Sequence, residues 1–176
     1  GLRHLIEAEP RISQAVPGTK FIIAGEGEDF EPYRQAMADP ARFEVHNRFI
    51  GTCERDELFQ RASVVVLPYI EATQSGVIPL AYSFAKPVVA TRVGARADSG
   101  DDDRTGRLVP PADSGALASA VIALLKNADK RRTMGAAGRE KLEQEWSPDA
   151  VAGHAIDVYR RAIRDRQRTS VATDPA

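Results

Sequence analysis

The segment Glu71–Val77, which reads EATQSGV, places one carboxylate among small polar residues and a glycine. It follows an apolar run that ends at Pro68 and precedes a run with helical composition. The amides of Ser75–Val77 are expected to face outward at the helix start, where the positive end of the helix dipole favours a phosphate. Because the Glu71 carboxylate would repel that anion, its expected partner is a neutral hydroxyl or a developing positive charge beside the phosphate. A sugar phosphate meets both requirements; a solvated loop acid is the alternative.

Residues between the carboxylate and the helix support the same arrangement. Thr73, Gln74 and Ser75 are polar residues just before the helix, so one of them can cap it. Gly76 has no side chain and therefore lets the backbone approach a ligand closely.

A second candidate phosphate loop, AGEGED, contains Gly25 and Gly27 and follows another apolar run. It lacks the third glycine of a dinucleotide fingerprint and an acidic residue at the proper distance. A tight strand-to-helix turn is an equally good interpretation of these two glycines.

Composition excludes several classes of protein. The 176 residues carry a net charge of −1, which argues against a nucleic-acid footprint or a polybasic membrane patch. The single cysteine excludes an internal disulfide and suits a reducing compartment. The three histidines share no common spacing, so no metal site is expected.

The elements that must position these loops alternate between short apolar runs and helical patterns, which predicts βαβ units. We expect strands at residues 20–25, 43–51, 63–68, 86–91 and 106–110. We expect helices at residues 2–16 (interrupted by Pro10), 28–38, 54–62 and 76–85, and three more after residue 113. The predicted fold is α/β: a Rossmann-like, doubly wound parallel sheet with helices on both faces and a helical C-terminal part. The runs at 20–25, 63–68 and 86–91 are apolar enough to be interior strands, and ligands are expected at the carboxyl ends of the strands.

Four segments occur in the order and spacing of one enzyme family. They read LIEAEPRISQAVPGTKFIIAGEGE, FIGTCERDELFQRASVVVLPYIEATQSGVIPLAYSFAKPVVATRVGARAD, TGRLVPPADSGALASAV and KRRTMGAAGREKLEQEWS. Over residues 2–164 the chain resembles the C-terminal domain of the family 4 (group 1) glycosyltransferases of the GT-B fold. The resemblance implies a retaining, metal-independent transfer of a sugar from a nucleotide sugar to an acceptor. It also implies that the transfer takes place in a cleft between two Rossmann-like domains.

The resemblance further implies which residues hold the donor. Glu71 matches the glutamate that contacts the donor sugar, and it is the expected catalytic residue. The matching donor-binding residues form a glycine turn, a nucleobase contact and the loop with its helix, and they are Gly25, Gly27, Ile50, Gly51, Thr73, Gln74, Ser75, Gly76, Val77 and Leu80. No metal and no cofactor besides the nucleotide diphosphate sugar substrate is implied.

Two departures from the family pattern concern the donor. The family's second glutamate, which holds the ribose, is absent, because its position falls on Pro79 by strict spacing or on Leu80 by alignment from KPVV. The family's phosphate-binding Arg and Lys precede the glycine matched by Gly1. The first strand and the N-terminal acceptor domain are therefore expected to be missing. A degenerate nucleotide-binding or scaffolding module is the alternative to an enzyme, and an unrelated Rossmann oxidoreductase is a disfavoured third interpretation.

We therefore expect residues 1–166 to form a nucleotide-sugar-binding domain, followed by a disordered tail at 167–176. The expected partners are a UDP- or GDP-linked sugar donor and the acceptor domain of the same protein, and no nucleic acid. The acceptor is expected to be a glycan, a lipid-linked intermediate or a small molecule, which fits polysaccharide biosynthesis. The expected location is the cytoplasm, with peripheral membrane association through the missing domain as an option.

Overall fold

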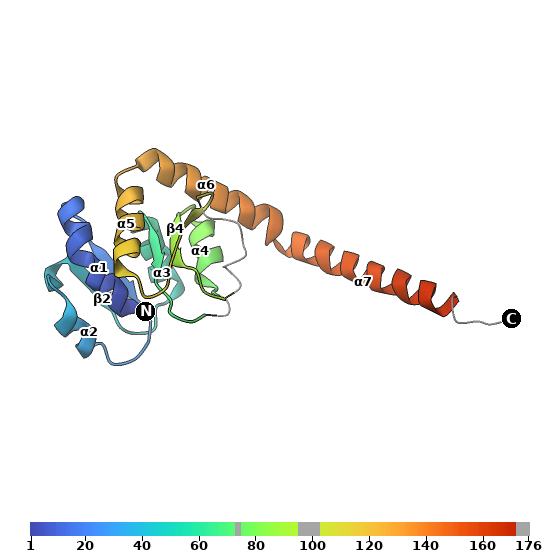
Figure 1. The fold of residues 1–176 in the computed structure, drawn as a ribbon, viewed down its shortest axis with the longest axis horizontal. Coiled ribbons are helices and arrows are strands. Elements are labelled where there is room, and N and C mark those ends of the chain that lie inside the picture. Colours follow the sequence, from blue (N-terminus) through green and yellow to red (C-terminus); the bar gives the residue numbers. More distant parts are fainter. Residues whose placement is uncertain (73–74, 95–102, 172–176) are drawn as a thin grey trace. The chain divides into compact units, whose positions relative to one another are not determined.

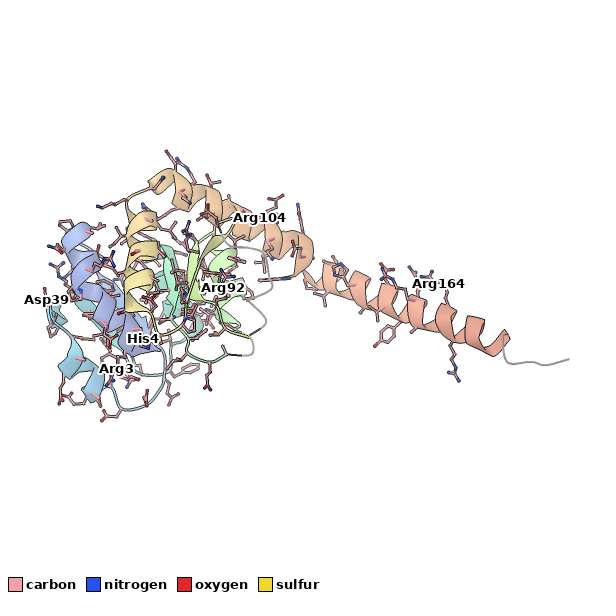
Figure 2. All side chains as sticks on the ribbon, in the orientation of Figure 1. Arg3, His4, Asp39, Arg92, Arg104 and Arg164 are labelled. Carbon is pink, nitrogen blue, oxygen red and sulfur yellow. The ribbon has the colours of Figure 1, made fainter. Side chains whose placement is uncertain are left out.

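The computed structural model describes residues 1–72, 75–94 and 103–171. The chain divides into two compact units, residues 1–139 and residues 140–176, and each unit is described by itself. Charged side chains occur along the whole described chain, and Asp39, Arg92 and Arg164 are among those labelled in Figure 2.

Among the described residues of the first unit, five strands form two parallel sheets (Figure 1). They are β1 (Phe21–Ala24), β2 (Phe43–His46), β3 (Val65–Leu67), β4 (Val88–Thr91) and β5 (Gly106–Val109). β1 pairs with β2, and the second sheet has the order β3-β4-β5, with parallel pairing throughout. The predicted parallel α/β class is thus confirmed. Of the three runs predicted to be interior strands, only β4 has a neighbour on each side, because β1 and β3 do not pair with each other in the described sheets.

Seven α-helices and one short 3-10 helix complete the described chain. They are α1 (Leu2–Ala15), α2 (Glu31–Ala36), η1 (Pro40–Arg42), α3 (Thr52–Arg61), α4 (Val77–Ser83), α5 (Ser114–Leu125), α6 (Ala128–Glu145) and α7 (Pro148–Val171).

Three predicted boundaries were wrong. The helix expected over residues 28–38 is shorter, because Asp39 caps the separate 3-10 turn by accepting the Ala41 amide. The strand expected over residues 43–51 ends at His46, where its pairing with β1 ends. Residues 167–171 of the tail expected to be disordered are helical, since α7 continues to Val171; residues 172–176 lie outside the described part.

Helix α1 is continuous across Pro10, contrary to the predicted interruption. Proline removes one helical hydrogen bond and crowds the preceding turn. The helix nevertheless buries an apolar face that includes Leu5, Ile6 and Ile12, and Ile12 is completely buried. Burying apolar surface on such a face stabilises the fold by about 25 cal/mol per Å², which offsets the lost helical hydrogen bond.

Helices cover both faces of the second sheet. On one face, α1 and α5 pack in a core that includes Ile12, Val89 and Leu117. Side chains alternate along a strand, so Val88 and Ala90 point to the opposite face, and they are equally buried. Helices α3 and α4 contribute the further buried residues Leu58, Ala81 and Tyr82, and the Tyr82 hydroxyl bonds Thr105 beside β5. The doubly covered sheet fits the doubly wound architecture.

A groove of about 990 Å³ separates β1 from β3. Both strands line it, and its other walls come from α1, α3, α4 and α5, with Leu2, Leu5, Leu58, Phe59, Val77, Leu80, Val121 and Leu125. Gly1 lies against the carboxyl end of β3, since a Cβ on Gly1 would stand 1.6 Å from the Pro68 carbonyl oxygen. The groove therefore divides what would otherwise be one continuous sheet.

The second unit consists of the end of α6 and helix α7. Lys141 lies 5.5 Å from the Trp146 ring centroid, which is a cation–π contact. Along α7, Val151, Val158 and Tyr159 are each more than half exposed. No helix among the described residues is both long enough and apolar enough to cross a membrane.

Candidate functional site

The loops that follow the strands meet at one edge of each sheet, because all the strands are parallel. At the first sheet, the Gly25 amide donates to the His46 carbonyl oxygen at 3.1 Å, and the Asn47 side chain donates to the Glu28 carbonyl oxygen at 3.2 Å. Gly25 has φ of +142°, a conformation that side-chain-bearing residues rarely adopt. The glycine turn after β1 is thus held by the end of β2, as a binding loop on a rigid scaffold would be.

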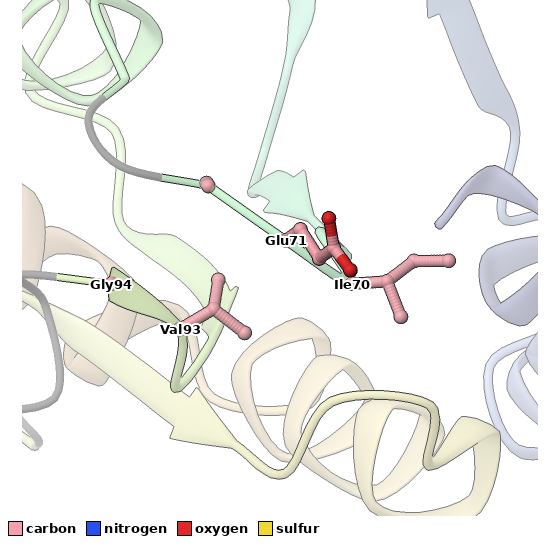
Figure 3. A pocket seen from close by; sticks show the side chains of 5 residues that line it. Ile70, Glu71, Val93 and Gly94 are labelled. Carbon is pink, nitrogen blue, oxygen red and sulfur yellow. The ribbon is translucent and has the colours of Figure 1, made fainter.

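The chain leaving β3 carries Glu71 at the carboxyl edge of the second sheet. Glu71 is exposed and lines a hollow of about 550 Å³. Ile70 and Ala72 line the same hollow, and Val93 and Gly94 approach from the loop after β4 (Figure 3). The predicted catalytic carboxylate therefore stands in solvent, at the mouth of a hollow between two strand-end loops.

The start of α4 follows the same loop. Ser75 Oγ accepts from the Val77 amide at 3.3 Å. The N-cap of α4 is nevertheless Gly76, with no side-chain cap hydrogen bond among the described residues, so Ser75 does not perform the capping that was predicted for one of three residues. The other two, Thr73 and Gln74, lie outside the described residues. The prediction that the Val77 amide is open to a phosphate is therefore met only in part, because the Ser75 hydroxyl already contacts it.

The groove between the sheets gathers predicted residues from two loops and helix α4. Gly25, Ile50, Val77 and Leu80 all line it, together with Glu26 and the exposed Phe49. A Cβ built on Gly27, Gly51 or Gly76 would meet no atom within 4 Å, so these three glycines border open space. The structure thus places the described donor-binding candidates around the carboxyl ends of β1, β2 and β3.

The position of the family's second glutamate lies within α4. Pro79 and Leu80 are both half-buried, and Leu80 lines the groove. Neither side chain has a hydrogen-bonding atom. A ribose contact at this point of the groove would therefore have to use the backbone or another residue.

An ion-pair cluster lies at the end of β2, next to the glycine turn. Arg61 donates to both carboxylate oxygens of Glu44, at 3.0 and 2.5 Å, and His46 Nε2 lies 2.8 Å from Glu44 Oε1. On the other side of the ring, His46 Nδ1 is 3.4 Å from Glu54, which also binds Arg48. The Arg61 hydrogen bond, followed by that of His46, lowers the pKa of Glu44 to about 2. The pKa of Glu54 is lowered mainly by its hydrogen bond to Arg48.

Glu44→Gln is expected to lower the free energy of unfolding at pH 7 by less than about 1 kcal/mol, because the pair is partly exposed and screened. The folded pKa of about 2 lies below the ordinary value of 4.5, so the ion pair stabilises the fold above pH 4.5. That contribution is lost as the pH falls from 4.5 to about 2. The difference between wild type and Glu44→Gln, measured by urea unfolding across this range, should shrink to nothing at the acid end. Glu57→Gln, an exposed change on the same helix as Arg61, is the control, and a wild-type advantage that persists below pH 2 would contradict the assignment.

Comparison with known proteins identifies the family. A family model described as "Glycosyl transferases group 1" matches residues 1–127, well over half of the chain. The chain belongs to the group 1 glycosyltransferases. This confirms the family that the segment order indicated.

Relatives of this glycosyltransferase chain are about twice as long. The phosphatidyl-myo-inositol mannosyltransferase of Mycobacterium leprae is 29% identical to it, over 98% of this chain and 46% of the relative. Among solved structures, HepE of Anabaena in complex with UDP has a TM-score of 0.78 at 18% identity, over 92% of this chain and 45% of HepE. The C-terminal domain of the group 1 glycosyltransferase LpcC from Francisella tularensis has a TM-score of 0.73 at 20% identity, over 84% of this chain and 80% of that domain. The chain thus spans about half the length of the whole proteins it matches, and it shares its fold with one of their C-terminal domains.

The sequence did not predict a contact of two residues beside the candidate site. Thr91 and Tyr69 join the end of β4 to the loop after β3 by hydrogen bonds between residues 22 positions apart. Their only signal in the sequence is a hydroxyl at each strand end. Among the described residues, no group of three or more His, Cys, Asp and Glu side chains is placed to hold a metal ion.

Proposed function

We propose that this chain is the donor-binding domain of a retaining, metal-independent glycosyltransferase. The full protein would move a sugar from a nucleoside diphosphate sugar to a glycan, a lipid-linked intermediate or a small acceptor. The observation that carries the proposal is the placement of Glu71 and the glycine-bearing turns at the carboxyl edge of parallel sheets, in a chain of this family. Ligands of open α/β sheets bind at that edge. The retaining and metal-independent character comes from the family resemblance.

Each candidate residue has a proposed role. Glu71 accepts hydrogen bonds from hydroxyls of the donor sugar, because an exposed carboxylate offers up to four acceptor positions. The turn Ser75–Val77 receives the diphosphate, with Gly76 leaving room for it. Gly25 and Gly27 form a second turn against the nucleotide, and the nucleobase lies beside residues 50–51. The groove shared by Gly25, Ile50, Val77 and Leu80 supports a single extended ligand across these positions.

The rest of the protein is proposed to supply two further parts. The split between β1 and β3 is best filled by one more parallel strand that enters from the segment preceding Gly1. Gly1 already lies at the carboxyl end of β3, so such a strand followed by α1 and β1 would form an ordinary right-handed crossover. The second part is an acceptor-binding N-terminal domain, which fits relatives of twice the length. The single cysteine suits the cytoplasm, which is the location we propose, with membrane association through that second domain.

The function is tested by calorimetric titration of the full-length protein with UDP and with GDP, followed by assays of sugar transfer from the corresponding donors. Saturable binding of one nucleoside diphosphate, with transfer in the presence of an acceptor, is the expected result. Binding without any transfer would favour a degenerate nucleotide-binding module. A protein that binds neither nucleotide would be a scaffold, and the proposal would be wrong.

The isolated chain of 176 residues is expected to bind the nucleotide more weakly than the full-length protein and to transfer no sugar. Catalysis requires that donor and acceptor be held together, which is worth about 7–11 kcal/mol of the barrier, and half of the cleft is outside this chain. The measurement is the same titration and transfer assay, run on both forms at equal concentration. Transfer by the isolated chain at a rate comparable to the full-length protein would place the whole active site within these residues.

A further inference from the structure

The chain that carries Glu71 is held to the sheet by a side chain where the backbone ladder stops. The last pair between β3 and β4 is Leu67 with Ala90. The next residue of β4 is Thr91, which is only 3% exposed. Its Oγ1 donates to the Tyr69 carbonyl oxygen at 2.5 Å and lies 3.4 Å from the Leu67 carbonyl oxygen. The Thr91 hydroxyl thus takes the place of a ladder bond and extends the attachment to β4 by two residues.

A second tie joins the same segment to the start of α4. The hydroxyl of Tyr69 lies 3.3 Å from Ser75 Oγ, and Ser75 Oγ also accepts from the Val77 amide at 3.3 Å. Tyr69 therefore contacts β4 through its carbonyl oxygen and the α4 end of the loop through its ring hydroxyl. Glu71 is two residues beyond Tyr69, on the stretch between the two attachments.

We propose that Thr91 and Tyr69 are positioning residues, which set the place of the Glu71 carboxylate against the donor sugar by tying its loop to β4 and to the start of α4. The inference rests on the proposed function. Neither residue needs to touch the donor. Thr91 is buried, and its hydroxyl hydrogen is already donated to a carbonyl oxygen.

The reason for such ties is the exposure of Glu71. A carboxylate in solvent at the mouth of an open hollow has few neighbours of its own to define its position. Its position must therefore come from the backbone that carries it. A misplacement of about 1 Å in a reacting group costs as much as about 100-fold in rate. Loss of the Thr91 hydroxyl is thus expected to act on turnover far more than on the affinity for free nucleotide.

The test is Thr91→Val in the full-length protein, because valine keeps the shape and strand preference of threonine and replaces the hydroxyl with a methyl group, which cannot donate a hydrogen bond. We expect kcat to fall by about 10- to 100-fold. We expect KM for the donor and Kd for the free nucleotide to change by less than about threefold, since neither the phosphate turn nor the nucleobase contact is altered. Thr91→Ser retains the hydroxyl that donates the hydrogen bond, so its turnover should be close to that of the wild type. Tyr69→Phe removes the other tie and should lower kcat by a smaller factor.

Thr105→Val is the matched control. Thr105 is 2% exposed, and its hydroxyl bonds the Tyr82 hydroxyl at 2.6 Å, before β5 begins and therefore at the opposite edge of the sheet. The Thr105→Val variant also loses a hydrogen bond of a buried threonine hydroxyl, to a side chain rather than to the backbone, and it should keep its turnover. Equal losses of kcat in the two valine variants, at a temperature where thermal melting shows both folded, would reduce Thr91 to a general structural role.

A double variant separates positioning from stability. If Thr91 acts through Glu71, adding Thr91→Val to Glu71→Gln should lower kcat by less than about twofold further, whereas independent effects would multiply. Amide hydrogen exchange at residues 70–72 should become at least about tenfold faster in Thr91→Val and stay unchanged in Thr105→Val. Multiplying effects, or unchanged exchange in Thr91→Val, would overturn the inference. A wild-type protein that binds no nucleoside diphosphate would overturn the proposed function instead, and the positioning role with it.

Discussion

In the full-length protein, Glu71→Gln is expected to lower the rate of sugar transfer by about 10- to 100-fold while changing the affinity for the free nucleoside diphosphate by less than about threefold. Hydrogen bonds to a charged group are worth about 1.5–3 kcal/mol, and each 1.36 kcal/mol of lost transition-state stabilisation is a factor of ten in rate. Glutamine keeps the size of the side chain and loses the charge. The loss should fall on turnover because Glu71 is proposed to contact the sugar, which the free nucleotide lacks.

The measurement pairs transfer kinetics with calorimetric titration of the free nucleotide. Glu31→Gln is the matched control, since it removes one exposed carboxylate from the first turn of α2, outside the proposed site. That control should keep both turnover and affinity within about twofold, as surface charge changes have small effects. Equal losses of affinity and turnover in Glu71→Gln would indicate that Glu71 contacts the phosphate or the base and not the sugar.

Gly76→Val is expected to weaken nucleotide binding by about tenfold or more and to leave the fold largely intact. A branched side chain at position 76 would occupy the space through which the phosphate reaches the turn, and one lost charge-assisted hydrogen bond costs about 1.5–3 kcal/mol. Gly76 has φ of −66° and ψ of −13°, which any residue adopts, and an added Cβ would meet no atom within 4 Å. Neither the backbone angles nor the packing of this turn therefore requires glycine. The destabilisation should be limited to about 1 kcal/mol, from a poorer residue at the helix start.

Two further variants define the outcome. Gly76→Ala should weaken nucleotide binding less than valine does, because its side chain is a single methyl group. Gly106→Ala should lower the melting temperature, because its Cβ would stand 1.8 Å from the Val88 carbonyl oxygen. Gly76→Val, in contrast, should lower the nucleotide affinity and leave the melting temperature nearly unchanged. Thermal melting and nucleotide titration are made on each variant. A well-folded Gly76→Val protein with unchanged nucleotide affinity would show that the phosphate does not bind at this turn.

Local sequence was sufficient for the main elements. The runs in β1, β3 and β4 are short, continuous and apolar, a pattern that occurs in strands covered on both sides, and all three are strands in parallel pairing. The turn at Gly25 followed from a residue type that its φ of +142° favours. The errors were at boundaries, such as the end of β2 at His46, because an end is decided by where the neighbouring strand stops.

What the sequence by itself determined was the family, the parallel α/β class, and Glu71 with its glycine turns as the candidate site, since each depends on residue type and local spacing. Only the tertiary structure decided which residues meet. Gly25, Ile50 and Leu80 line one groove because the tertiary structure brings two distant loops and helix α4 to it. Thr91 reaches the Tyr69 carbonyl oxygen only because β4 pairs with β3 in one particular register. A hydrogen bond between residues 22 positions apart depends on that register, and a shift of one residue would turn the Thr91 side chain to the other face of the sheet.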